Sequence, residues 1–167
     1  MAFRRFFLAG GLFCLAGLLL LIISFFGLSN SKYISLDGVI YRVSLADTPQ
    51  TRELGLMFQS SMPRSQGMFF VFDREDFHVF WMKNTYIPLD MLWIDSHFKV
   101  VDFYRNAKPS SELLIVPTCP SLYVLELNAG EISAHNFRPG MTVKVNAPLL
   151  SVYYFFQEGL NWFRRFY

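Results

Sequence analysis

The stretch YISLDGVIYRVSL, which runs from Tyr33 to Leu45, decides the fold class of this chain. From Val39 to Leu45 every second residue is apolar or aromatic, and this alternation is typical of a half-buried β-strand. The dipeptide Asp37-Gly38 separates this run from the shorter run Tyr33–Leu36 and predicts a two-residue hairpin turn of type I′. The stretch therefore predicts that a β-hairpin opens a β domain.

Strand-like runs continue along the rest of the chain. They are Met68–Phe72, Val79–Met82, Leu89–Ile94, Phe98–Tyr104, Tyr123–Leu127 and Thr142–Val145. Short strands at close spacing, with no amphipathic helix between them, favour a β-sandwich or a β-barrel. One short helix is expected at Pro49–Met57, because Thr48 suits the N-cap position and Pro49 suits the first helical position. The fold class is therefore predicted to be mainly β with one short helix.

Composition limits the class of protein. The 167 residues suffice for one domain, and the hydrophobic fraction of 53% excludes intrinsic disorder. Two cysteines are too few for a disulfide framework. A net charge of +2 forms no basic stripe, so we expect no nucleic-acid partner.

The first segment, residues 1–28, predicts a membrane anchor. No residue from Phe6 to Leu28 is charged, and as a helix this run would span roughly 35 Å, enough to cross the hydrocarbon core. Arg4 and Arg5 precede it, which places the N-terminus in the cytoplasm. We expect a single pass through the cytoplasmic membrane and a domain of residues 29–147 on the periplasmic, extracytoplasmic side. A cleaved signal peptide is the alternative, and it would send the domain to the same side.

The last segment, residues 148–167, predicts an aromatic amphipathic helix. Its large apolar side chains recur at helical spacing: Leu149, Tyr153, Phe156, Leu160, Phe163 and Tyr167. Aromatic residues followed by arginines suit the membrane interface, whereas the alternative is a helix packed on the domain's own sheet. Membrane lipid is thus an expected partner through Phe6–Leu28 and, in the first alternative, through Pro148–Tyr167.

Polar residues within apolar runs mark the candidate site. Lys83, Asn84 and Asp90 interrupt the segment FWMKNTYIPLD (Phe80–Asp90), and Glu126 stands between two leucines. Arg52, on the short predicted helix, is a further charged residue of this kind. Such groups either pair with one another or face a cleft, because isolated burial of a charge is costly. No metal-ligand, nucleotide-binding or nucleophile motif is present, so we expect no metal and no cofactor.

Five sequence blocks resemble a known family. In order they are Arg52-x-x-Gly55-Leu56-Met57, Gly67–Phe72, Phe80–Thr85, Ile87–Asp90 and Val124-Leu125-Glu126-Leu127-x-Ala129-Gly130. Together they resemble the bacterial and archaeal domain-of-unknown-function family 192 over about residues 36–146. The resemblance implies a single compact β domain, a jelly-roll-like sandwich, often behind a signal or membrane segment. It implies no reaction, because none is established for the family.

Two functions of different class fit these residues. The first is a binding module in which a cleft for a small polar or anionic ligand, or for a partner's peptide, is lined by Arg52, Trp81, Lys83, Asn84, Asp90 and Glu126. The second is a hydrolase in which Asp90 or Glu126 is the general base and Lys83 stabilises developing charge. Both require the carboxyl groups and Lys83 to converge on one face of the fold. A purely structural ion-pair network that sets strand register is the third possibility.

Overall fold

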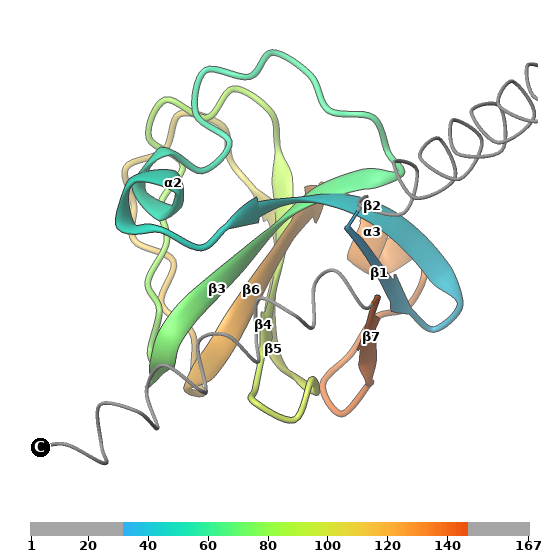
Figure 1. Cartoon of the computed structure of the whole chain (residues 1–167). Coiled ribbons are helices and arrows are strands. Elements are labelled where there is room, and N and C mark those ends of the chain that lie inside the picture. The colour runs from blue at the N-terminus through green and yellow to red at the C-terminus, as the bar shows by residue number, and fades with distance from the viewer. Residues whose placement is uncertain (1–31, 147–167) are drawn as a thin grey trace, which may run out of the picture. The chain divides into compact units, whose positions relative to one another are not determined.

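The computed structural model describes residues 32–146, which form seven strands and two short helices (Figure 1). The elements are β1 (Tyr33–Leu36), β2 (Val39–Ala46), α2 (Pro49–Leu54), β3 (Gln66–Asp76), β4 (Leu89–Ile94), β5 (Val100–Ala107), β6 (Ser121–Asn128), α3 (Glu131–Ala134) and β7 (Val143–Val145). Within this range no helix has the length and apolarity needed to cross a membrane. The predicted anchor at 1–28 and the predicted helix at 148–167 lie outside the described residues.

Hydrogen bonding joins the strands into one curled sheet rather than two facing sheets. The strand order is β5-β4-β6-β3-β2-β1-β7, and only β2 and β3 run parallel. The two edges of the sheet are also joined by backbone contacts. Lys99 and Thr142 form an isolated β-bridge, and the backbone N–H of Val143 donates to the carbonyl of Phe98 at 2.8 Å. The sheet is thus a half-barrel, and the prediction of a mainly β fold is confirmed.

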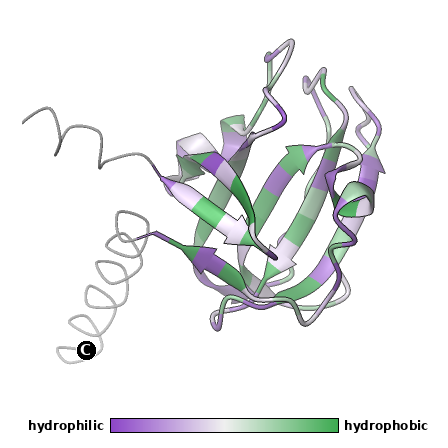
Figure 2. Cartoon of the chain, turned by 90° about the vertical axis from the view of Figure 1, so that its right-hand side faces the viewer, coloured by the Kyte–Doolittle hydropathy of each residue, from purple (hydrophilic) through white to green (hydrophobic). Residues whose placement is uncertain are grey.

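The opening hairpin forms as predicted. Asp37 and Gly38 have φ values of 50° and 82°, and two successive positive φ angles are the mark of a type I′ turn. In β2 the side chains of Tyr41 and Val43 are buried, whereas Ile40 is exposed, as the alternation predicts. Figure 2 shows the same banding of hydrophobic and hydrophilic residues along the strands.

Both faces of the sheet are buried. We define the inner face as the one that carries Phe69 and Leu125, whose cluster includes residues from β1, β5 and β7 and therefore fills the curl. We define the outer face as the one that carries Phe70 and Val124, whose cluster includes Leu56 and residues from the loops beyond β3 and β5. The outer face is thus covered by Leu56, just after α2, and by loops.

The helices differ from the prediction in two ways. Helix α2 is capped by Thr48, as expected, but it ends at Leu54 rather than Met57, because Gly55 takes a positive φ of 49°. The prediction of a single helix was wrong, since α3 follows Gly130. No side chain caps α3 locally, and Gly130 itself has a φ of 94°. The local sequence therefore lacks the usual signal for a helix start.

The two ends of the described domain are hydrogen-bonded to each other. The backbone N–H of Tyr33 donates to Asn146 Oδ1, and the backbone N–H of Asn146 donates to the carbonyl of Tyr33, both at 3.1 Å. Figure 1 shows this β1–β7 edge on the side of the domain opposite α2. The chain therefore enters and leaves the domain at one place, away from the helix.

Candidate functional site

Strand register separates the two predicted catalytic carboxyl groups. In the antiparallel pair β4–β6, Asp90 lies opposite Leu127 and Glu126 lies opposite Met91. Residues directly opposite each other point to the same face of a sheet. Leu127 belongs to the inner cluster and Met91 to the outer cluster, so Asp90 is on the inner face and Glu126 on the outer face. The predicted convergence of both carboxyl groups with Lys83 on one face is therefore wrong, and any site on the outer face has to do without Asp90.

Asp90 builds the fold. Its Oδ1 accepts the backbone N–H of Asn106 at 2.8 Å, and its Oδ2 accepts those of Gly130 at 3.0 Å and Ile132 at 2.8 Å. The fully buried carboxylate thus supplies, from a distant strand, the cap that α3 lacks locally. With both oxygens occupied by backbone donors, Asp90 is not available as a general base.

Glu131 forms a second inner-face network that the sequence analysis missed. Its carboxylate accepts the hydroxyl of Tyr41 at 2.7 Å and pairs with Arg64 at 3.1 Å and His135 at 3.4 Å. Burial, followed by the hydrogen bond to Glu131, raises the pKa of Tyr41 above its ordinary value. The sequence analysis did not single out Glu131, because two of its three partners, Tyr41 and Arg64, lie far along the chain.

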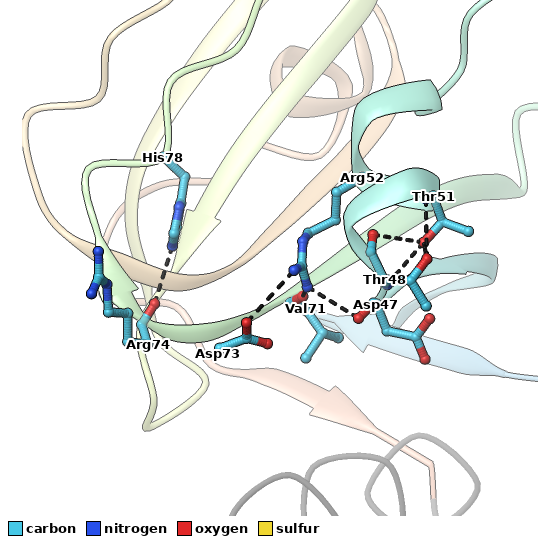
Figure 3. A network of polar contacts seen from close by, with 8 residues as sticks. All are labelled: Asp47, Thr48, Thr51, Arg52, Val71, Asp73, Arg74 and His78. Carbon is cyan, nitrogen blue, oxygen red and sulfur yellow. Dashed lines mark hydrogen bonds and ion pairs between the residues drawn. The ribbon is translucent and has the colours of Figure 1, made fainter. Parts of the chain in front are cut away.

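Arg52 holds α2 against the sheet (Figure 3). Its Nη1 donates to the carbonyls of Asp47 at 3.0 Å and Val71 at 2.7 Å, and its Nη2 lies 3.7 Å from Asp73. The guanidinium also lies over the ring of Phe72, 5.4 Å from its centre. Arg52 therefore links α2 to the end of β2 and to the middle of β3.

Glu126 is buried on the outer face without a partner. The residue is only 4% exposed, its Oε2 has no hydrogen-bond partner, and none of the ion pairs in the described part of the chain includes it. Burial raises the pKa of Glu126 to about 8. The carboxyl group is therefore mainly protonated at neutral pH. An unsatisfied buried polar group of this kind needs an explanation.

Two cavities adjoin each other beside α2. The smaller, of about 40 Å³, is lined by residues that include Arg52, Phe70, Phe80, Trp81, Thr85 and Glu126. The larger, of about 430 Å³, is lined by residues that include Glu53, Leu54, Met57, Trp81, Lys83 and Asn84. Four lining residues are common to both: Glu53, Leu54, Met57 and Trp81. We call the two cavities together the α2 groove, with Glu126 in its narrow part.

Loop geometry places Trp81 on the rim of the groove. Phe80 pairs with Ile115 as an isolated bridge, where a full strand was predicted, and the ring of Phe80 packs inward against Phe70. The next side chain, Trp81, consequently faces outward and is 42% exposed. Lys83 Nζ lies 4.9 Å from the centre of its ring, a cation–π contact.

Asn84 shapes the same loop through its backbone. It has a positive φ of 54°, and its carbonyl accepts the backbone N–H of Phe58 at 2.8 Å, which links the loop to the segment after α2. Five of the six predicted site residues, all but Asp90, thus line one groove. In residues 32–146 no group of three His, Cys, Asp or Glu side chains comes together as a metal site.

The fold and groove define a class: a small, mainly β domain with a half-barrel sheet and a groove beside α2, the helix that connects the parallel strands β2 and β3. The chain belongs to the DUF192 family (Uncharacterized ACR), whose sequence profile matches residues 33–145. This confirms the resemblance that the five sequence blocks carry. No curated protein matches the chain.

Two solved structures share the fold. One is the crystal structure of a protein proposed to be a transcription regulator from Sinorhizobium meliloti, with 38% identity, a TM-score of 0.66, and coverage of 69% of this chain and 94% of that chain. The other is a protein of unknown function from Novosphingobium aromaticivorans, with 32% identity, a TM-score of 0.64, and coverage of 67% of this chain and 83% of that chain. Neither relative brings an established activity.

Proposed function

We propose that this chain is a membrane-anchored, extracytoplasmic binding module whose ligand occupies the α2 groove. The observation that carries the proposal is the unpaired carboxyl group of Glu126 in the narrow part of an open groove. A buried polar group without a partner costs on the order of 1–3 kcal/mol, and a ligand that supplies the missing hydrogen bond recovers this free energy. A few polar groups within an apolar lining are typical of small-molecule sites.

Each of the other groove residues has a separate part in binding. Trp81 offers an exposed aromatic face, and Lys83 and Asn84 offer polar groups on the rim of the larger cavity. Arg52 keeps α2 in place through its contacts with β2 and β3 rather than by contacting the ligand. A volume of about 430 Å³ lies within the usual range for ligand pockets.

A ligand screen on the full chain in detergent tests this proposal. A metabolite that binds in the groove raises the Tm of the wild type, and the rise disappears in Trp81→Ala. The matched control is Tyr104→Ala, which removes a comparably exposed aromatic side chain (45% exposed) that does not line the groove. A ligand whose Tm shift survives Trp81→Ala unchanged binds elsewhere and contradicts the proposal.

Membrane attachment is tested separately. Since Tyr33 and Asn146 are bonded to each other, segments 1–28 and 148–167 join the domain at one place, which supports attachment of both to the same membrane. The full chain is expected to resist alkaline extraction from membranes, and its domain to be cleaved by protease added to intact spheroplasts. Protection of the domain in spheroplasts would contradict the extracytoplasmic orientation.

The hydrolase alternative retains one observation, the raised pKa of Glu126, which suits a general acid at neutral pH. Asp90 no longer supports this alternative, because it lies on the other face and both of its carboxylate oxygens accept backbone N–H groups. Turnover of a bound ligand that disappears in Glu126→Gln would favour the enzyme over the binding module.

A further inference from the structure

We infer that the ligand of the α2 groove presents a primary ammonium group on an apolar stem to the carboxyl group of Glu126. This inference rests on the proposed function and names the chemical class of its ligand. A free amine and a lysine side chain of a partner both present this chemistry.

The shape of the groove suits such a ligand. The narrow cavity, of about 40 Å³, has room for a group no larger than a few heavy atoms. The wider cavity, of about 430 Å³, is bordered by Leu54, Met57 and Trp81 and can hold an apolar body. A slender stem with a small polar head therefore fills both parts, whereas a branched polar group such as a sugar would not enter the narrow part.

The charges around the groove favour a cation. The charged residues that line the groove besides Glu126 are Arg52, Glu53 and Lys83, and Arg52 is paired outside the lining with Asp73. Arg52 is paired with Asp73 and bonded to two carbonyls, and it forms no ion pair with Glu126 within 4.0 Å. Once ionised, Glu126 has no ion-pair partner among these groups, and an incoming ammonium supplies one.

The aromatic lining provides a second favourable contact. Phe70, Phe80 and Trp81 surround the narrow cavity, and ring faces attract cations. The chain itself shows this contact on the groove rim, where the ammonium of Lys83 lies 4.9 Å from the ring centre of Trp81. Lys83 does not reach Glu126, because no ion pair within 4.0 Å joins them.

Binding of an ammonium also predicts a linked proton release. In the free protein the pKa of Glu126 is about 8, so the carboxyl group is mainly protonated at pH 7 and must lose its proton to pair with a cation. The affinity for an amine therefore rises with pH, by up to about tenfold per pH unit, and levels off above pH 8. A neutral ligand that accepts a hydrogen bond from the protonated acid has the opposite dependence.

Calorimetric titration of the full chain in detergent tests the inference with two probes of equal shape, 4-phenylbutylamine and 4-phenylbutan-1-ol. The amine is expected to bind at least tenfold more tightly than the alcohol at pH 8. Titrations at pH 7 in buffers of different ionisation enthalpy are expected to show release of close to one proton per amine bound. Glu126→Gln is expected to abolish both the preference and the proton release.

Glu112→Gln is the matched control, because Glu112 is exposed to solvent and lines neither cavity. It is expected to change amine affinity by less than about threefold, since an exposed charge is screened. Retained alcohol binding in Glu126→Gln shows that the variant is folded and its groove intact.

The outcomes separate this inference from the proposed function. Equal binding of amine and alcohol, without proton release, overturns the ammonium assignment and leaves the binding module standing. Binding of neither probe to a folded wild type overturns the inference and counts against the groove as a ligand site. Tighter binding of Nα-acetyl-lysine amide than of 4-phenylbutylamine assigns the ammonium to a partner's lysine, and the reverse assigns it to a small amine.

Discussion

Asp90 and Glu126 are buried acids on neighbouring strands, yet their surroundings are opposite. On the inner face, the carboxylate of Asp90 accepts three backbone N–H groups. On the outer face, Glu126 has an oxygen with no partner. The difference shows that burial of an acid does not by itself indicate function. A carboxylate whose oxygens all have hydrogen-bond donors holds the chain together, whereas one with an unbonded oxygen beside a groove can still bind a ligand.

Removal of Asp90 is expected to have the largest effect on stability. Asp90→Ala leaves one buried and two part-buried backbone N–H groups without their acceptor, which we expect to lower the free energy of unfolding by roughly 4 kcal/mol. Urea unfolding followed by circular dichroism measures this. The control Asp73→Ala removes an exposed carboxylate and is expected to cost about 0.5 kcal/mol or less. Equal losses in the two variants would remove the distinction between the faces.

Replacement of Glu126 is expected to have the next largest effect on the free energy of unfolding, and to raise it rather than lower it. Its folded pKa of about 8 lies above the ordinary value of 4.5, so the folded state binds its proton more tightly than the unfolded state. Its contribution to stability is complete below pH 4.5 and is lost as pH rises toward 8, by roughly 1.4 kcal/mol per pH unit.

The amide in Glu126→Gln cannot ionise, so the variant does not lose this stability as pH rises. We expect the variant to be more stable than the wild type by about 3 kcal/mol at pH 8, with little difference at pH 5. Urea unfolding of both proteins across this pH range gives the difference directly, and other titrating groups cancel in it. A difference that does not change with pH would show that Glu126 has a partner in the folded protein.

Tyr41→Phe is expected to have the smallest effect of the three. It removes one donor from Glu131, while Arg64 and His135 remain as partners of that carboxylate. We therefore expect a loss of about 1–2 kcal/mol in the free energy of unfolding. Thermal unfolding measures it, with Tyr104→Phe as the control that alters an exposed hydroxyl. A loss as large as that of Asp90→Ala would mean that the inner-face acids act as one unit.

Much of the fold could be predicted because its signals are local. The turn at Asp37 and Gly38, the alternation in β2 and the cap at Thr48 all depend on residues a few positions apart. Helix α3 could not be predicted, since the group that caps it, Asp90, is 40 residues away from Gly130 in the sequence.

The candidate site was predictable as a set of residues but not as an arrangement. Asp90 and Glu126 each interrupt an apolar run, and nothing local tells which face either one takes. That depends on the pairing of β4 with β6, where a shift of one residue would have placed both carboxyl groups on the same face. The sequence predicts only that Arg52 interrupts an apolar region, whereas its contacts with Asp47 and Val71 reveal that it positions α2.

The bonded ends of the domain have a mechanical consequence. Strands β1 and β7 are antiparallel, and a load applied between the segments that leave at Tyr33 and Asn146 would pull them apart from one end, like a zipper. The residue pairs between the two strands would then separate one at a time and at low force, in the order Ile34 with Val145, Ser35 with Lys144 and Leu36 with Val143. The β1–β7 edge would therefore yield first under tension, while β3, β6 and the α2 groove keep their structure.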